Sequence, residues 1–260
     1  MNSMRQFASS LKAKHRVSSI GEGRRVYAIG DIHGHLEELE ELLAWIESDL
    51  ESHEGRSDLV FLGDYIDRGP DSRGVLKRLA KEKLPGDAHH FLMGNHEAVL
   101  LDLVDGHASD GFSWLSYGGR EMLESYGVKK SKILSSAGTI AKLIVETLPK
   151  SHLEFLRNLQ TMVTIDDYAF AHAGIRPGKS LKKQKARDLM WIRDPFLSSK
   201  KDHGKVVVHG HTIEAEPADR ANRIGLDTGC YAGGSLSAVR LEGSGRHFVS
   251  VPSRGPEWPR

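Results

Sequence analysis

The 260-residue sequence has little of several features that would each point to a particular class of protein. Its single cysteine, Cys230, excludes an intramolecular disulfide and a cysteine-rich zinc site, and it fits a reducing compartment. The formal net charge is only +1, so no overall electric field favours nucleic acid as a partner. No apolar run is long enough to cross a bilayer, so we expect a cytoplasmic protein without a membrane partner.

The remaining composition is typical of a globular protein with a large core, since 39% of residues are hydrophobic and 27% are charged. No internal repeat or low-complexity linker marks a domain boundary. The first twenty residues contain Arg5, Lys12, Lys14 and Arg16 and no acidic residue. We therefore expect a loosely ordered basic leader over residues 1–24, with a targeting segment as the alternative, and a single domain over residues 25–260.

Short apolar runs that alternate with helical patterns predict an α/β core. The predicted strands are Val26–Ile29, Leu59–Leu62, His90–Met93, Tyr168–Ala171, Val206–Val208 and Ile224–Leu226. The predicted helices that follow the first three strands are Leu36–Leu50, Ser72–Lys81 and His96–Val104. We expect a mostly helical insertion over residues 100–159 and two further strands over residues 238–251, separated by Gly243-Ser244-Gly245.

Acidic residues and histidines follow the predicted strands at the points where these strands end. Asp31 and His33 come after the first strand, and alternation along an extended chain places both side chains on one side. Asp64 and Arg68 come after the second strand, where they form either a turn held by an ion pair or a shared metal ligand beside a phosphate-binding guanidinium. In open α/β sheets the carboxyl ends of the strands are where ligands bind.

The later strands are followed by an asparagine and by histidines. Asn95 is either an ordinary N-cap of the next helix or an amide oxygen ligand for a metal, and His96 lies in the first turn of that helix. His172 and His211 follow the fourth and fifth strands, and a glycine lies within two residues of each. A lone histidine at a strand end is usually a hydrogen-bonded structural residue, but several such clusters in one chain favour a common pocket.

Taken in order, these clusters resemble the phosphoprotein phosphatase family of calcineurin-like metallophosphoesterases. The motifs are GDIHG from Gly30, GDYIDRG from Gly63, GNHE from Gly94, HAG from His172 and HGHT from His209. The segment from Leu226 to Tyr231 resembles the bacterial and phage-type serine/threonine protein phosphatase branch. The resemblance implies a four-layer α/β/β/α sandwich with the helical insertion beside it, so that residues 25–260 form one metallophosphoesterase catalytic domain.

The resemblance also implies a site with two divalent metal ions, most simply manganese, with iron or zinc as alternatives. By motif, the implied ligands of the first ion are Asp31 and His33, the bridging ligand is Asp64, and those of the second ion are Asn95, His172 and His211. Oxygen and imidazole ligands suit hard or borderline metals. Two carboxylates against two divalent ions leave about two positive charges to attract a phosphate group.

The implied reaction is attack on phosphorus by a hydroxide that bridges the metals. His96 would protonate the leaving oxygen, and Asp67 would orient His96 and keep it cationic. Arg68 would clamp the phosphoryl oxygens, and Arg193 is the candidate for a second substrate-binding arginine. The alternative for Arg193 is a surface ion pair with Asp188 or Asp194.

A phosphorylated protein or peptide is the substrate that we expect from these motifs. The alternative is a nucleotide polyphosphate, cleaved by a symmetrical diadenosine tetraphosphatase or another polyphosphate hydrolase of the same family. Trp114 and Tyr117 are aromatic candidates for nucleoside binding, but their spacing predicts that they share a buried helix face. A non-catalytic binding module and a nuclease of the wider fold are disfavoured, the first by the intact ligand set and the second by the near-neutral charge.

Overall fold

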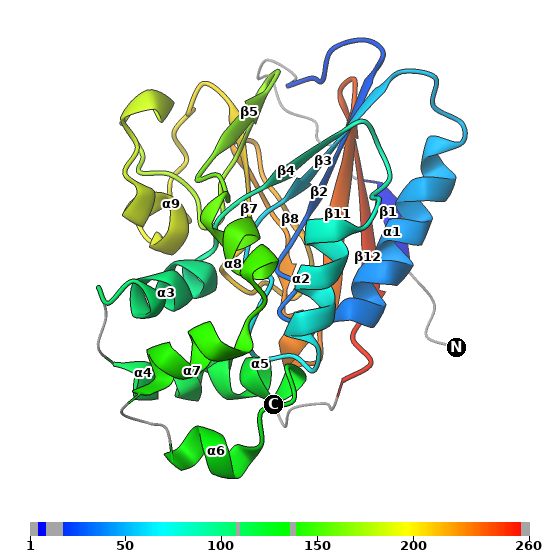
Figure 1. The fold of residues 1–260 in the computed structure, drawn as a ribbon. Coiled ribbons are helices and arrows are strands. Elements are labelled where there is room, and N and C mark those ends of the chain that lie inside the picture. Colours follow the sequence, from blue (N-terminus) through cyan, green and yellow to red (C-terminus); the bar gives the residue numbers. More distant parts are fainter. Residues whose placement is uncertain (1–4, 9–17, 108–109, 136–138, 256–260) are drawn as a thin grey trace.

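The computed structural model describes residues 5–8, 18–107, 110–135 and 139–255. Two β-sheets pack face to face, and helices cover their outer faces, which gives the expected four-layer α/β/β/α sandwich (Figure 1). Helices α1 and α2 lie on one outer face, and the short helix α9 lies on the opposite side beyond the second sheet (Figure 1). None of the described helices is both long and apolar enough to cross a membrane.

The seven-stranded first sheet has the order β1-β12-β11-β2-β3-β4, and β10 pairs with β11 beside this path. Strands β2, β3 and β4 are parallel, and β11 runs antiparallel to β2. The bounds of its strands are β1 Arg5–Ala8, β2 Arg24–Ile29, β3 Arg56–Phe61, β4 Ala88–Phe91, β10 Asp227–Thr228, β11 Ser235–Glu242 and β12 Gly245–Pro252.

The five-stranded second sheet has the order β5-β6-β7-β9-β8, in which β6, β7 and β9 are parallel. Its strands are β5 Val163–Ile165, β6 Tyr168–Phe170, β7 Val206–His209, β8 Ala218–Asp219 and β9 Arg223–Gly225. Because these strands are parallel within each sheet, the loops that follow their carboxyl ends leave at the same edge of that sheet.

The helices fall into those that flank the sheets and those of the insertion. The flanking helices are α1 Leu36–Leu50, α2 Ser72–Lys81, α3 Asn95–Val104 and α9 Ala186–Trp191. The insertion contains α4 Gly111–Trp114, the π-helical turn η1 Leu115–Gly119, α5 Arg120–Ser125, α6 Lys130–Ser135, α7 Ile140–Thr147 and α8 Lys150–Arg157. Short 3₁₀ turns are η3 Leu181–Lys183 and η4 Cys230–Ala232.

Alternation along the strands divides the core into layers. In β2, Tyr27 and Ile29 pack with the helices, whereas Val26 and Ala28 pack between the two sheets. A third, smaller cluster, which includes Phe196, lies on the outer side of the second sheet. This alternation follows from the two-residue period of a strand, and it buries both faces of the first sheet.

Most elements lie where the sequence predicted them, and α1 and α2 have the predicted bounds. The expected leader needs one correction, because Arg5–Ala8 forms the edge strand β1, paired antiparallel with β12. Residues 1–4 and 9–17 of that leader lie outside the described part of the chain. Strands β5, β8 and β10, of two or three residues each, were not predicted.

The two sheets approach each other closely just after β2 ends. A Cβ atom on Gly30 would lie 2.4 Å from the carbonyl oxygen of Leu226, which follows β9 in the second sheet. Real Cβ atoms do not approach a carbonyl oxygen so closely, so a larger residue would push the sheets apart at this edge.

We expect Gly30→Ala to lower the free energy of unfolding by about 1–3 kcal/mol, as other overpacked positions do. Urea denaturation should show this loss. The matched control is Gly21→Ala, because a Cβ atom there would meet its nearest neighbour, Asp166, at an ordinary 3.6 Å. Equal stability of the two variants would show that the sheets do not need the close approach.

Candidate metal centre

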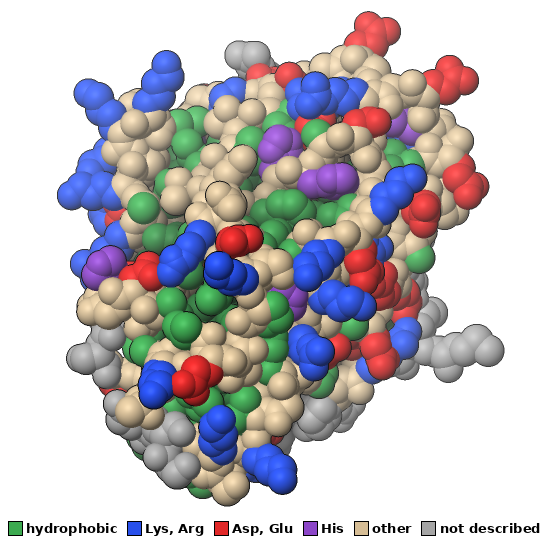
Figure 2. Space-filling view, viewed as in Figure 1, with side chains coloured by type: hydrophobic (Ala, Val, Ile, Leu, Met, Phe, Trp, Pro, Cys, Tyr) green, Lys and Arg blue, Asp and Glu red, His purple; other side chains and the backbone are tan. Residues whose placement is uncertain are grey.

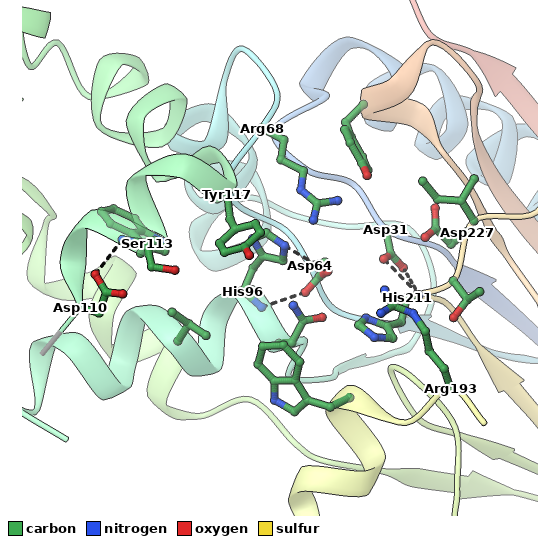
Figure 3. A pocket seen from close by; sticks show the side chains of 17 residues that line it. Asp31, Asp64, Arg68, His96, Asp110, Ser113, Tyr117, Arg193, His211 and Asp227 are labelled. Atoms are coloured by element: carbon green, nitrogen blue, oxygen red, sulfur yellow. Dashed lines mark hydrogen bonds and ion pairs between the residues drawn. The ribbon is translucent and has the colours of Figure 1, made fainter. Parts of the chain in front are cut away.

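The side chains of the six residues predicted as metal ligands gather at the carboxyl edge of the two sheets. The loop after β2 carries Asp31 and His33, the loop after β3 carries Asp64, and α3 begins with Asn95 directly after β4; His172 follows β6, and His211 follows β7. Figure 3 shows Asp31, Asp64 and His211 around the pocket at this edge. Five strands that are distant in sequence thus supply one cluster.

Asp64 lies between two groups of side chains that are each able to hold a metal ion. One group is His33, Asp64 and His96, and the other is Asp64, His172 and His211, with donor atoms within 4.8 Å of one another. The Oδ2 atom of Asp64 lies 3.5 Å from Nε2 of His33, and its Oδ1 atom lies 3.5 Å from Nε2 of His172. The two carboxylate oxygens therefore face the two groups separately, as a shared ligand requires.

The histidines are oriented by hydrogen bonds to backbone carbonyls. Nδ1 of His33 lies 2.8 Å from the oxygen of Ile66, and Nδ1 of His172 lies 2.9 Å from the oxygen of Leu62. A proton on Nδ1 leaves Nε2 with a free lone pair that points to Asp64. Nε2 of His211 is buried and has no hydrogen-bond partner among the described residues.

The electrostatics of the cluster also fit divalent cations. Burial lowers the pKa of His33 and His172, and it lowers the pKa of His211 to about 3, so these rings are neutral at pH 7. Burial raises the pKa of Asp31 well above its usual range, and the charges of Asp227 and Asp64 raise it further. Neutral imidazoles beside crowded carboxylates are the donors that a cation needs and stabilises.

Asn95 and Asp31 complete the cluster. The amide Oδ1 atom of Asn95 lies 2.9 Å from Nε2 of His172, and the helix cap is Gly94 rather than Asn95, so the N-cap alternative is wrong. The backbone N–H of His211 donates to both oxygens of Asp31, at 3.2 and 3.1 Å. The residues present therefore fit a site for two metal ions.

Several loops of the cluster have an unusual backbone conformation. Positive φ values occur at His33 (43°), Asp64 (52°), Asp67 (70°), Arg68 (67°) and His211 (64°). Residues other than glycine rarely adopt a positive φ, and this conformation costs on the order of 1 kcal/mol or more per residue. Such strain is typical of functional sites, where the surrounding structure holds the backbone in place.

The carboxylate of Glu97 holds the loop that carries Asp64. It accepts hydrogen bonds from four backbone N–H groups, those of Asp64 (2.9 Å), Tyr65 (2.8 Å), Ile66 (3.3 Å) and Gly94 (3.0 Å). Glu97 is fully buried. In the sequence, Glu97 is the last residue of the GNHE motif, and a glutamate in the first turn of a predicted helix was the available signal for such a role.

His96 differs from the other histidines of the cluster. Its Nδ1 atom lies 2.7 Å from Oδ2 of the buried Asp67. Burial opposes the charged form of His96, but the charge of Asp64 and the hydrogen bond to Asp67 outweigh this and raise its pKa. An imidazole that holds its proton, beside imidazoles that do not, suits a proton donor rather than a ligand.

The cluster opens into a pocket of about 680 Å³ (Figure 3). Arg68 and Arg193 reach this pocket from different sides, and the guanidinium carbon of Arg68 lies 4.1 Å above the ring of Tyr231. Among the described residues Arg193 makes no ion pair, and Asp188 instead pairs with Arg176 at 2.6 Å. The ion-pair alternative for Arg193 is therefore wrong, and its guanidinium is available to an anion.

Two further residues in the pocket are Asp227, which the sequence did not single out, and Tyr117, which the sequence placed on a buried helix face. Asp227 lines the pocket beside Asp31, and its Oδ1 atom accepts from the N–H of Gly229 at 3.0 Å. Tyr117 lines the pocket with 64% of its surface exposed, whereas Trp114 is buried, so the predicted shared face is wrong. The π-helical turn after Trp114 turns the next aromatic residue outward.

A sheet edge that gathers carboxylates, histidines and two arginines has the chemistry of a metal-dependent phosphoesterase. The family model for calcineurin-like phosphoesterases matches residues 24–230, so the chain belongs to the calcineurin-like phosphoesterase family.

Relatives within this family carry different names. The chain is 32% identical to an asymmetrical bis(5'-nucleosyl)-tetraphosphatase of Oceanobacillus iheyensis, which covers 89% of this chain and 94% of that protein. It is 29% identical to a symmetrical bis(5'-nucleosyl)-tetraphosphatase of Nitrosospira multiformis, with 84% and 92% covered. It is 28% identical to serine/threonine-protein phosphatase 1 of Salmonella typhimurium, with 84% and 93% covered.

A solved structure has the same fold over most of both chains. It is a crystal structure of a protein provisionally named a diadenosine tetraphosphatase, with a TM-score of 0.63 and 25% identity. The match covers 93% of this chain and all of that chain. The similarity therefore includes the helical insertion as well as the two sheets.

Replacement of Asp64 by asparagine should remove bound metal and activity together, because it takes away the charge that faces both groups of ligands. Calorimetric titration with Mn²⁺ and metal analysis of the dialysed protein would measure the loss. The control is His96→Asn, which should keep its metal while kcat falls by about 10²–10⁴-fold, the usual worth of general acid catalysis. An empty metal site in His96→Asn would make His96 a ligand.

Proposed function

We propose that the protein hydrolyses nucleotide polyphosphates, with bis(5'-nucleosyl) tetraphosphates as the substrate class. Asp31 and His33 would hold one metal ion, Asn95, His172 and His211 would hold the other, and Asp64 would be shared by both. Manganese is the proposed metal, with iron and zinc as alternatives, because the donors are oxygen and imidazole nitrogen. When bound, the two ions supply an activated water and positive charge for the phosphate.

The remaining polar residues bind the phosphate and move a proton. Arg68 and Arg193 bind phosphoryl oxygens from two sides of the pocket and stabilise the charge that develops on them. His96 donates its proton to the leaving oxygen, and Asp67 holds the ring in the orientation for this transfer. The phosphate group thus needs no other side chain of the pocket.

The choice of substrate rests on the part of the pocket that lies away from the phosphate-binding residues. This part extends from His96 along the insertion to Ser113 and Asp110, and the exposed ring of Tyr117 lines it (Figure 3). On the side of the second sheet the walls are the half-exposed side chains of Trp191 and Ile213. Aromatic and apolar walls next to a phosphate site suit a nucleoside, whose base stacks on them.

A second hollow extends the pocket beyond Trp191. It has a volume of about 500 Å³, and it shares Val99 and Trp191 with the pocket at the metal centre. Arg187 of α9 lines it, at the end of an exposed basic segment that includes Lys182. Lys and Arg side chains gather along the same edge of the molecule as α9 (Figure 2). The exposed basic side chains beside this hollow suit a polyanion such as a polyphosphate chain.

The relatives support this choice, since two of the three that are described above are named as tetraphosphatases. The serine/threonine-protein phosphatase among them favours the second candidate, hydrolysis of phosphorylated proteins or peptides. That reaction uses the metal-binding residues, His96 and the arginines, but it gives no role to the aromatic and apolar walls of the pocket.

A comparison of substrates tests the choice directly. We expect kcat/KM for diadenosine tetraphosphate to exceed that for phosphoserine and phosphotyrosine peptides by at least about tenfold, because stacking of one base contributes about 1–3 kcal/mol. Steady-state rates at matched pH and Mn²⁺ concentration would measure both. Faster turnover of either phosphopeptide would replace this proposal by the protein phosphatase candidate.

Substitutions in the two hollows separate nucleoside binding from phosphate chemistry. Tyr117→Ala and Arg187→Ala should each raise KM for diadenosine tetraphosphate by about 3- to 30-fold and leave the hydrolysis of p-nitrophenyl phosphate unchanged. Lys182→Ala is the control for Arg187→Ala, because Lys182 is exposed on the same segment but does not line the hollow. Equal effects on both substrates would contradict a nucleoside role.

A further inference from the structure

The segment Trp114–Gly119 of the helical insertion contacts the loop after β3 that carries Asp67 and Arg68. Nε1 of Trp114 donates a hydrogen bond of 3.1 Å to Oδ2 of Asp67. The backbone N–H of Arg68 donates to the carbonyl oxygen of Gly118 at 3.1 Å. One segment of the insertion thus touches the partner of the proton donor and the backbone of the phosphate clamp.

The indole of Trp114 and the ring of His96 share one oxygen of Asp67. Oδ2 of Asp67 accepts from Nδ1 of His96 at 2.7 Å and from Trp114 at 3.1 Å, while Oδ1 has no partner among the described residues. Trp114 and Asp67 are both buried, so water does not compete for this oxygen. With His96 as its only partner, the carboxylate would be free to turn about its last bond and offer either oxygen.

Two glycines allow the close packing around the indole ring of Trp114. A Cβ atom on Gly119 would lie 2.4 Å from the indole ring of Trp114, and one on Gly118 would lie 2.3 Å from the backbone nitrogen of Arg68. Gly118 also has a φ of 110°, which side chains rarely allow. The glycine pair is therefore required by two close approaches.

We propose that Trp114 is a positioning residue for the proton donor, acting through Asp67. The indole N–H fixes which oxygen of Asp67 faces His96, and that oxygen in turn fixes the orientation of the imidazole ring. Indole is suited to this role because its N–H donates a hydrogen bond and its nitrogen does not accept one. The inference rests on the proposed role of His96 as the general acid.

A general acid matters most when the leaving oxygen is a poor leaving group, so the test compares two phosphate esters. With saturating Mn²⁺, Trp114→Phe should lower kcat on phenyl phosphate by about 10- to 100-fold, and on 2,4-dinitrophenyl phosphate by less than about threefold. Bound metal and KM should stay as in the unmodified protein. The matched control is Trp45→Phe, since Trp45 of α1 stacks on His247 away from the pocket.

Gly119→Ala keeps Trp114 and displaces its indole, so it serves as a second variant if Trp114→Phe folds poorly. Gly119 has a φ of −65°, which alanine adopts without strain. We expect the same selective loss on phenyl phosphate. A loss of equal size on both esters in both variants would mean that the indole only supports the fold, and it would overturn the inference.

A spectroscopic measurement does not depend on activity. In the metal-free protein the indole N–H resonance of Trp114, assigned by its disappearance in Trp114→Phe, should exchange slowly with solvent and shift in Asp67→Asn. Fast exchange, or no shift, would contradict the hydrogen bond.

His96→Asn separates the inference from the proposed function. If it loses activity equally on both esters, His96 is not the general acid, and that part of the proposed function fails. If it is selective for phenyl phosphate while Trp114→Phe is not, only the role of Trp114 fails.

Discussion

The candidate metal centre depends on one buried carboxylate, that of Glu97. Four backbone N–H groups converge on it, and three of these belong to the consecutive residues Asp64, Tyr65 and Ile66. The loop would otherwise relax, because the φ of 52° at Asp64 is unfavourable for a side chain. Glu97 also joins this loop to the start of α3, which carries Asn95 and His96. The position of the Asp64 carboxylate is therefore set by a residue outside the proposed ligand set.

The parts of the fold that could be predicted are those that local sequence patterns determine. Apolar runs identified β2, β3 and β7, and helical periodicity identified α1 and α2 with their bounds. The ligand cluster was predictable for a related reason, since parallel strands bring residues that follow them to one edge. No knowledge of the tertiary structure was needed to expect that Asp31, Asp64 and His172 would meet.

The parts that could not be predicted depend on contacts between distant segments. Tyr117 faces the pocket because a π-helical turn follows Trp114, and no periodicity in the sequence announces such a turn. The contact of Trp114 with Asp67 joins residues 47 positions apart, and the acceptance of four N–H groups by Glu97 requires the folded loop. Side-chain pairing across the insertion thus sets what surrounds the proposed metal site.

The edge strand β1 bears on how this molecule meets others of its kind. It covers the outer side of β12 from His247 to Ser250, a stretch that includes the apolar pair Phe248 and Val249. A strand with free N–H and C=O groups along its edge is a template for pairing with another chain. With Arg5–Ala8 in place, that edge is filled by the chain's own backbone. Displacement of this short segment would leave residues 247–250 of β12 open to pairing with another chain, so four residues cover this part of the sheet.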